Sequence, residues 1–402
     1  MYKLSHWPRM SMSTGREAQL RVRLSDSDIR GPAATHRLGS AVHSSLRRNR
    51  ARSSHFGRLI GATGAAVALT AGLVACGSGD GEAASDFSAC LMTSETGIAD
   101  RSFNQQAWAA LTQLEEESGI EIRNLAKSGS TDYPVIGEQF VQQGCSMIIG
   151  VGFNTTSTVE QLAPANPDIK FVVIDDTLES EVDNATSLTY ATDQGAFLGG
   201  YLAAGMSKTK VVGVYGNQPI PPVQLYMTGF VNGVNHYNEV KNESVRVLGW
   251  DPVAKTGQFV GSYTDVNKGK LITESELQQG ADVIFPVAGP IAQGTAVAVS
   301  DAGGAAAGKY MLWVDSDGCI ANAEYCGIML STVEKGIQKS LYDVTKSTVD
   351  DQFPSGSYVG DVANGGVGLA PYHDLEGAIP AELKSEIEAL NTGIADGTVS
   401  VG

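Results

Sequence analysis

The chain has 402 residues, and its 44 acidic and 28 basic side chains give it a formal net charge of −16. Twelve basic and three acidic residues precede Cys76, so the rest of the chain keeps 16 basic and 41 acidic residues, a net charge of −25. Because this excess of carboxylates repels phosphate backbones, we expect no nucleic-acid partner.

The N-terminal region has the layout of a bacterial export signal. Arginines concentrate before residue 59, the run 59–75 is uncharged and apolar, and a small polar stretch follows it. This order of basic, apolar and small-residue segments is typical of a signal peptide. A basic segment of more than 50 residues is long for a signal, so we expect translation to begin downstream, near Val42 or Leu46.

The signal ends in the sequence LVAC at residues 73–76, which matches the lipobox of bacterial lipoproteins. We therefore expect residues 1–75 to be removed, Cys76 to carry a lipid, and residues 76–87 to form a flexible tether. Two or three acyl chains on one cysteine hold a protein stably at a membrane, whereas a single chain does not. The alternative is a cysteine buried at the end of a transmembrane anchor, for which an apolar run of 17 residues is marginal.

Four further cysteines suit two disulfides in an oxidising compartment. Cys90 and Cys145 each open an apolar, strand-like run, so they meet at one end of the sheet if the two strands are parallel neighbours. Cys319 and Cys326 lie close together in one predicted loop and form the natural second pair. A metal site is the alternative, although no Cys-x-x-Cys or histidine-rich spacing supports it.

Strand-like and helical patterns alternate along the chain after the tether. The predicted strands are short and apolar on both faces, as in a parallel sheet covered by helices. They lie at 89–93, 121–126, 146–151, 170–175, 210–215, 245–250, 282–287, 310–315 and 328–331. The predicted helices lie between them, at 104–118, 133–143, 193–206, 222–238, 267–279, 291–301 and 333–347. This alternation predicts an α/β fold with parallel sheets.

The length of the folded part favours two lobes over one core. Four predicted strands fall before residue 190, and the others begin at 210. Parallel sheets of this kind bind ligands beyond the carboxyl ends of their strands. Two lobes that face each other across those ends would therefore enclose a ligand cleft.

The sequence GIADRSFNQ at 97–105 resembles the G-x-x-D-K/R-S-F-N-Q signature of the basic membrane protein family. Other landmarks agree in order and spacing, among them IGVGF at 149–153, FVVID at 171–175, WVDSD at 313–317 and GVGL at 366–369. The family comprises lipoprotein substrate-binding components of ABC transporters, related to the purine nucleoside receptor type. It is an expectation from this resemblance that the chain binds a nucleoside.

The resemblance also implies the type I periplasmic-binding-protein fold, in which two Rossmann-like lobes are joined by three crossovers. Each lobe is then discontinuous in sequence. We expect residues 88–192 with about 318–331 to form lobe 1, and residues 193–317 with about 332–402 to form lobe 2.

The family's ligand contacts carry over to particular residues of this chain. Phe103 and Tyr263 would stack on the two faces of a nucleobase, at about 1–3 kcal/mol per base. Asp315 would accept hydrogen bonds from two ribose hydroxyls, and Asn154 and Asp175 would contact the base or the sugar. Gly289 would allow the backbone to approach the ligand closely.

Two positions depart from the family pattern. Ser94 stands where the family often has an aspartate at the purine edge. The family's S-x-x-K reads Ser-Thr-Val-Glu at 331–334, and Lys335 follows one place later. We therefore expect the stacking frame to be kept and part of the polar specificity to be altered.

Enzymatic readings have little support in the sequence. VDSDG at 314–318 mimics the start of a dehalogenase-type phosphatase, but that motif should end the first strand of its domain rather than a late one. No G-x-S-x-G, H-E-x-x-H or dinucleotide-binding G-x-G-x-x-G pattern occurs. We expect a binding protein that is not an enzyme and that carries no cofactor or metal.

The expected function is that of an extracytoplasmic lipoprotein, held at the cell membrane by Cys76, which delivers a nucleoside-like solute to an ABC permease with a cytoplasmic ATPase. Two alternatives stay open. The solute could be another small polar molecule such as a sugar, or the chain could be a sensory or surface lipoprotein without a transport role.

Overall fold

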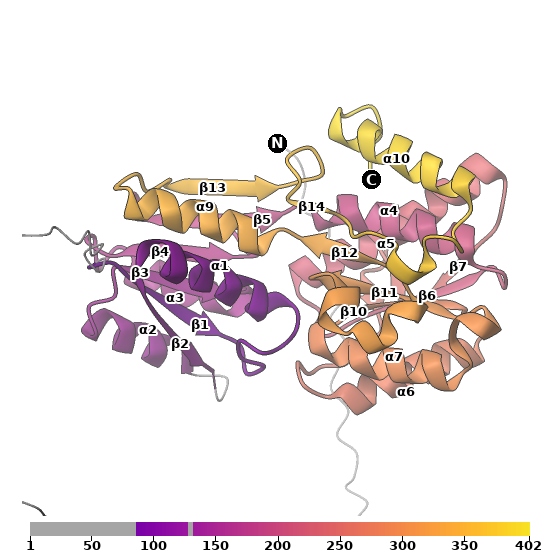
Figure 1. Cartoon of the computed structure of the whole chain (residues 1–402), viewed down its shortest axis with the longest axis horizontal. Coiled ribbons are helices and arrows are strands. Elements are labelled where there is room, and N and C mark those ends of the chain that lie inside the picture. The colour runs from indigo at the N-terminus through magenta and orange to yellow at the C-terminus, as the bar shows by residue number, and fades with distance from the viewer. Residues whose placement is uncertain (1–85, 128–131) are drawn as a thin grey trace, which may run out of the picture. The chain divides into compact units, whose positions relative to one another are not determined.

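Strands and helices alternate along residues 86–127 and 132–402, which are the residues that the structure, a computed structural model, describes. The described residues belong to one compact unit, in which two six-stranded sheets define two lobes (Figure 1). The expected signal segment, the lipidation site at Cys76 and the tether up to residue 85 lie outside the described residues. Within the described part of the chain, no helix is both long and apolar enough to span a membrane.

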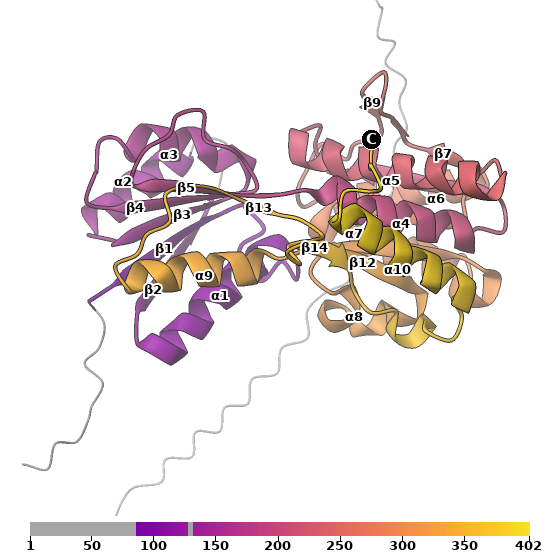
Figure 2. The same ribbon diagram turned by 90° about the horizontal axis from the view of Figure 1, so that it is seen from above.

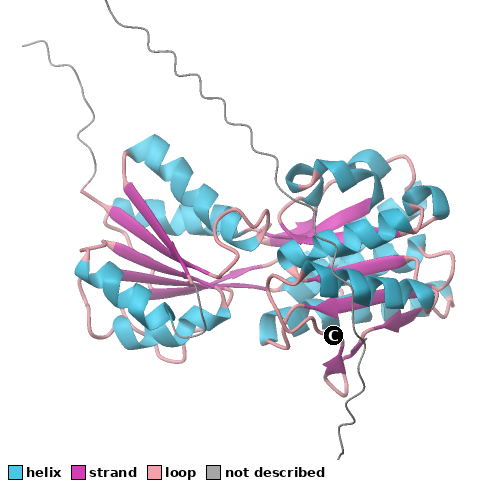
Figure 3. Ribbon diagram, turned by 90° about the horizontal axis from the view of Figure 1, so that it is seen from below, coloured by secondary structure: helices cyan, strands magenta, loops and turns pink. Residues whose placement is uncertain are grey.

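The sheet of lobe 1 is parallel throughout and has the order β13-β5-β4-β3-β1-β2. Its strands are β1 (Ser88–Thr93), β2 (Glu121–Ala126), β3 (Met147–Val151), β4 (Lys170–Ile174), β5 (Ala185–Tyr190) and β13 (Gly356–Gly360). Its helices are α1 (Phe103–Ser118), α2 (Asp132–Gln142), α3 (Thr156–Leu162) and α9 (Ile337–Val349). Figure 3 shows the strands with helices on both faces.

Strand β1 shows why both faces of this sheet are apolar. Successive side chains of a strand point to opposite faces. Ala89 and Leu91 belong to the same buried cluster as Leu111 of α1, whereas Cys90 and Met92 belong to the cluster that includes residues of α2 and α3. A strand covered on both faces must be apolar at every position, which is the pattern that predicted it.

The sheet of lobe 2 has the order β14-β12-β11-β10-β6-β7, and only β14 runs antiparallel to its neighbour. Its strands are β6 (Val211–Gly216), β7 (Arg246–Leu248), β10 (Val283–Val287), β11 (Tyr310–Asp315), β12 (Met329–Lys335) and β14 (Val367–Leu369). Its helices are α4 (Thr192–Met206), α5 (Pro221–Lys241), α6 (Val266–Gln278), α7 (Ala292–Asp301), α8 (Gly318–Ala321) and α10 (Ala381–Ala395). Two further short strands, β8 (Trp250–Asp251) and β9 (Thr256–Gly257), form a small hairpin (Figure 2).

Helices α4 and α5 pack unusually close to each other. A side chain at Gly200 would lie 2.1 Å from the carbonyl oxygen of Phe230, and one at Gly233 would lie 2.0 Å from that of Phe197. Glycine at these two positions therefore lets the helix backbones touch. This contact fixes the start of α5, which reaches the ligand edge of the sheet.

The return of the chain to lobe 1 differs from the expectation. Residues 318–331 do not return, because β12 pairs in parallel with β11 of lobe 2. Helix α9 and strand β13 return instead: α9 packs beside α1, and β13 extends the first sheet by pairing with β5. Residues 332–402 were expected in lobe 2, but this stretch therefore contributes to both lobes. Figure 1 shows α9 next to α1 and β13 next to β5.

Three short segments of the described chain pass between the lobes, as the resemblance implies. They follow β5, β12 and β13 and centre on Ala191, Gly336 and residues 361–366. The segments lie side by side, since the amide of Ala191 donates to the carbonyl of Gly360 (2.8 Å) and the amide of Gly336 donates to that of Gly366 (2.8 Å). A hinge between the lobes would therefore run through these three segments.

Both expected disulfides are present. Cys90 is bonded to Cys145, which lies two residues before β3, the neighbour of β1. Cys319 is bonded to Cys326. Asp317 and His373 lie close to the sulfur of Cys319, but a disulfide sulfur is not a thiolate ligand, so the cluster does not favour the metal-site alternative.

Candidate functional site

A cavity of about 110 Å³ lies between the carboxyl ends of the two sheets. Its walls come from both lobes, at the strand ends where ligands of open α/β sheets bind. All seven expected ligand-contact residues line it: Ser94, Phe103, Asn154, Asp175, Tyr263, Gly289 and Asp315. The structure thus brings together residues that are up to 221 positions apart in the chain.

Phe103 is held in the cavity by the N-terminal turn of α1. The buried carboxylate of Asp100 accepts from the backbone amides of Ser102 (3.0 Å), Asn104 (2.9 Å) and Gln105 (3.0 Å), which would otherwise lack partners at a helix start. Burial raises the pKa of Asp100, and these hydrogen bonds oppose the rise. Asp100 therefore caps the start of α1.

Gly152 makes room for the ring of Phe103. Its φ is +95°, and a side chain there would come within 3.3 Å of the ring. Gly289 has a φ of +54° with open space around it, so its left-handed backbone, rather than a close contact, requires glycine.

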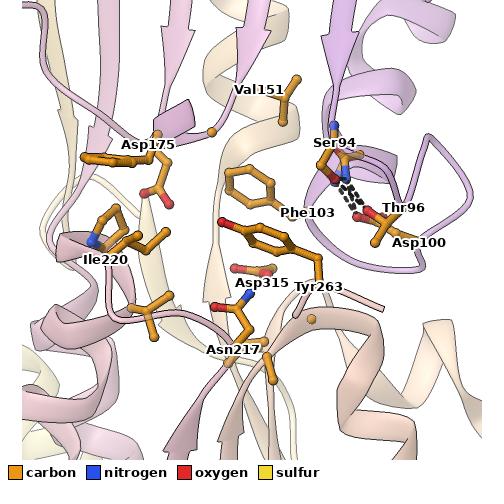
Figure 4. A pocket seen from close by; sticks show the side chains of 18 of the residues that line it. Ser94, Thr96, Asp100, Phe103, Val151, Asp175, Asn217, Ile220, Tyr263 and Asp315 are labelled. Atoms are coloured by element: carbon orange, nitrogen blue, oxygen red, sulfur yellow. Dashed lines mark hydrogen bonds between the residues drawn. The ribbon is translucent and has the colours of Figure 1, made fainter. Parts of the chain in front are cut away.

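Tyr263 enters the cavity from the loop before α6, in the opposite lobe to Phe103. Its hydroxyl accepts a hydrogen bond from the side-chain amide of Asn154 across the cleft (3.1 Å). Figure 4 shows both rings directed into the same space. A planar ligand that enters this space meets an aromatic surface from each lobe.

One end of the cavity carries two carboxylates and a lysine. The ammonium of Lys335, at the end of β12, lies 2.7 Å from a carboxylate oxygen of Asp175 and 3.8 Å from one of Asp315. Asp315 also accepts from the hydroxyls of Ser102 (2.9 Å) and Tyr226 (3.2 Å). Burial raises the pKa of Asp175, and the charge of Lys335 opposes that rise. The lysine thereby compensates two buried acids from different lobes.

The two aspartates share a backbone conformation that is rare for residues other than glycine. Asp175 follows β4 and Asp315 ends β11, and each has a φ of +68°. Side chains tolerate this left-handed region at a cost of about 1–3 kcal/mol, and such residues cluster at functional sites. The conformation turns both carboxylates from their strands toward the cavity.

The sequence led us to expect that the lysine of the S-x-x-K pattern is missing from the site. The structure has a lysine there, because Lys335 lines the cavity. The pairing of β12 with β11 shifts by one residue between Met329 and Thr332, which is a β-bulge. The extra residue moves Lys335 into the cavity wall, where its side chain is only 3% exposed. Its ammonium also lies 5.0–5.7 Å from the ring centres of Phe103, Tyr190 and Tyr226.

Comparisons with known proteins identify the family of the chain. A family model described as "ABC transporter substrate-binding protein PnrA-like" matches residues 87–401. The chain belongs to this family. It is therefore the substrate-binding component of an ABC transporter, whose partners are a small-molecule ligand and a permease with its ATPase.

Relatives of this PnrA-like family member extend over most of its length. The "ABC transporter nucleoside-binding protein BmpA" of Lactococcus lactis subsp. cremoris is 28% identical over 86% of this chain and 98% of that protein. An uncharacterized lipoprotein of Pyrococcus abyssi is 26% identical over 83% of this chain and 81% of that protein. A crystal structure of an ABC transporter solute-binding protein from Aeropyrum pernix K1 has a TM-score of 0.70 at 22% identity and covers 78% of this chain and 92% of that one.

Several lining residues had no role predicted from the sequence, among them three polar ones from different elements. Tyr226 lies in the first turns of α5, and Asn217 directly follows β6. Tyr133 lies near the start of α2. A signal was available for Asn217, since it follows an apolar strand at the ligand edge; the two tyrosines are on helices and resemble ordinary packing residues.

Two other acids of the chain turn away from the cavity. Asp176 accepts from the hydroxyl of Thr156 (2.6 Å) in lobe 1. Asp317 accepts from the backbone amide of Cys319 (2.9 Å) and pairs with the imidazole of His373 (2.6 Å). The second acid of the phosphatase-like motif therefore begins a short helix, where its carboxylate already has two partners.

Proposed function

We propose that the chain is a lipid-anchored receptor that binds a nucleoside between its lobes and delivers it to the ABC permease. The observation that carries the proposal is the combination of two aromatic rings from opposite lobes with a carboxylate–lysine cluster in one cavity. The rings of Phe103 and Tyr263 suit a nucleobase, because every base offers two flat faces for stacking.

The charged end suits the sugar. The carboxylate oxygens of Asp175 and Asp315 are acceptors, and the vicinal hydroxyls of a ribose can donate to them. Each carboxylate oxygen has two acceptor sites, so Asp315 keeps capacity beyond its bonds to Ser102 and Tyr226. Lys335 can donate to a ring or hydroxyl oxygen while it stays paired with Asp175.

Transport would proceed by closure of the lobes about the three crossover segments. The ligand enters between open lobes, and its contacts with both walls favour the closed form. The Asn154–Tyr263 hydrogen bond joins the lobes at the cavity wall and would form as they close. The closed form would then dock on the permease.

Isothermal titration calorimetry of the purified protein tests the ligand. We expect stoichiometric binding of a nucleoside, much weaker binding of free ribose, and no turnover of either compound. Tight binding of a sugar with no binding of nucleosides would replace this proposal with the sugar alternative. The name of the lactococcal relative adds support, since it describes that protein as nucleoside-binding.

The membrane anchor is a separate part of the proposal, since Cys76 lies outside the described residues. The lipobox at 73–76 and the lipoprotein names of relatives support it. Labelling cells with radioactive palmitate should label the wild-type protein and not a Cys76→Ser variant. Equal labelling of both proteins would contradict the assignment.

A further inference from the structure

Four side chains of the kinds that ligate metals come together in lobe 2. Ligand atoms of Asp317, Cys319 and His373 all lie within 4.8 Å of one another. Cys326 adds a fourth atom, because its sulfur is bonded to that of Cys319. None of these four residues lines the cavity between the lobes. The cluster of one carboxylate, one imidazole and two sulfurs is therefore separate from the ligand site.

Two segments that are distant in the chain hold the cluster together. Asp317 precedes α8, and Cys319 lies within that short helix. His373 begins a 3₁₀ turn, His373–Leu375, which packs against the turn Ala323–Ile328 that carries the second cysteine. One carboxylate oxygen of Asp317 lies 2.6 Å from Nε2 of His373, and the other accepts from the amide of Cys319 (2.9 Å). These contacts hold three of the four groups in place independently of the disulfide.

The oxidation state of the cysteines decides whether the cluster can bind a metal. A sulfur in a disulfide is not a thiolate, so the oxidised cluster offers one carboxylate and one imidazole. A dithiol reductant breaks the S–S bond by giving it two electrons, its two protons pass to the cysteines, and the reductant itself closes to a disulfide. A bound metal ion then displaces both thiol protons into the solvent. The reduced cluster offers two thiolates, an imidazole and a carboxylate, which are four ligands that tetrahedral Zn²⁺ accepts.

Little movement is needed to place these four ligands around one ion. Zinc bonds of about 2.0–2.3 Å separate the ligand atoms of a tetrahedron by about 3–4 Å. The carboxylate, the imidazole and the sulfur of Cys319 already lie within 4.8 Å of one another. Cleavage of the S–S bond leaves the second sulfur free to move apart from the first. The side chain of His373 is 29% exposed, which gives an ion a path of entry from solvent.

We propose that the reduced cysteine pair Cys319 and Cys326 forms a zinc site together with Asp317 and His373. The disulfide and the metal are then alternative ties between the same two cysteines. In the oxidised protein the aspartate and the histidine form an ordinary polar pair beside the disulfide. In the reduced protein Zn²⁺ replaces the S–S bond and also joins α8 to the turn at His373. The ion therefore restores the closure of the 319–326 loop that reduction removes.

Titration of Co²⁺ and Zn²⁺ into the purified full-length protein tests the proposal. One sample stays oxidised, and another is reduced with dithiothreitol, which is then removed in the absence of air. Co²⁺ serves as a spectroscopic substitute for zinc, because thiolate ligands give it a charge-transfer absorption and tetrahedral sites give it intense visible bands. We expect the reduced protein to bind one equivalent of Co²⁺ with both signals and to release it to Zn²⁺. The oxidised protein should show neither signal.

Substitutions then locate the metal. The double variant Cys319→Ser/Cys326→Ser should bind no Co²⁺ after reduction. His373→Gln and Asp317→Asn each replace a ligand by a neutral amide, and asparagine still caps a helix. Each should weaken zinc binding at least about tenfold, which is the smaller loss expected when even an outer-shell partner is removed. His236→Gln is the matched control, because this histidine packs against aromatic rings of α4 and should leave zinc affinity unchanged.

Thermal unfolding gives an independent measurement. A ligand that binds only the native state stabilises it, so Zn²⁺ should raise the unfolding temperature of the reduced protein and not that of the oxidised one. Equal metal binding by the oxidised protein or by the double cysteine variant would overturn the proposal, since thiolates would then not be ligands. A reduced protein that binds no metal, or that stays unfolded when zinc is present, would overturn it as well.

Discussion

The two ends of the cavity use opposite kinds of chemistry. At one end Lys335 compensates two carboxylates, and its side chain is almost fully buried. At the other end the hydroxyls of Ser94 and Thr96 carry no charge. They form a hydrogen bond in which either one can be the donor. Charges in a buried site are costly unless their partners stay in place, so the charged end demands one geometry. The neutral end lacks this constraint, because either hydroxyl can be the donor.

The largest effect is expected at the charged end, from the substitution Lys335→Met. It removes the cation and keeps the apolar length of the side chain. Removing one partner of a buried ion pair costs about 3–5 kcal/mol, so both the unfolding free energy and the nucleoside affinity should fall strongly, the affinity by about a hundredfold. Chemical denaturation and calorimetry measure the two effects. Lys339→Met is the matched control, because Lys339 is 74% exposed and should change neither quantity.

A smaller effect is expected from removing the aromatic surfaces between the two ends. Phe103→Ala and Tyr263→Ala should each weaken nucleoside binding by about 1–3 kcal/mol, while binding of free ribose should change less. Phe103→Leu serves as a control that keeps apolar bulk without a stacking face. Full nucleoside affinity in a folded Phe103→Ala protein would show that the base lies elsewhere.

The pH dependence of binding should separate the two ends. Burial raises the pKa of Asp175, so this residue takes up its proton at a higher pH than an exposed aspartate, whose pKa is about 3.9. Protonation removes the charge that pairs with Lys335 and an acceptor for the sugar. As the pH falls from neutral, affinity should therefore decline before ordinary aspartates titrate.

The matched variant is Asp175→Asn, which holds the residue permanently neutral at the same size. Its affinity should be lower at neutral pH and should respond less to acid than that of the wild type. An identical pH profile in both proteins would assign the titration to another group.

The smallest effect is expected from Ser94→Ala at the neutral end. The variant loses one uncharged hydroxyl, and Thr96 keeps the other, so affinity should fall by about 0.5–1.5 kcal/mol for adenosine and inosine alike. Calorimetry with both nucleosides measures it. A loss as large as that of Lys335→Met would contradict the contrast between the ends.

The sequence predicted most of what depends on local pattern. Buried central strands such as β3 and β4 were found within one residue, because a strand covered on both faces is an unbroken apolar run. The edge strand β13 was missed, since its burial pattern is largely exposed and its sequence GSYVG has no such run. The course of the chain through α9 back to lobe 1 depends on contacts between distant segments, which no local pattern contains.

The residues of the candidate site also differ in how well the sequence predicted them. The seven expected residues were named by their positions in motifs of the family that the sequence resembles, and all of them line the cavity. Lys335 was the difficult case, because its place depends on a bulge that changes the register of β12 by one residue. A single-residue shift exchanges the two faces of a strand, so motif spacing alone assigned the position to Glu334.

The placement of the disulfides has a consequence for exported protein. Among the described residues, each disulfide closes within one lobe: Cys90–Cys145 in lobe 1 and Cys319–Cys326 in lobe 2. The crossover segments carry no covalent tie between the lobes in this part of the chain. Oxidation can thus stiffen each half of the receptor while the angle between the halves stays free.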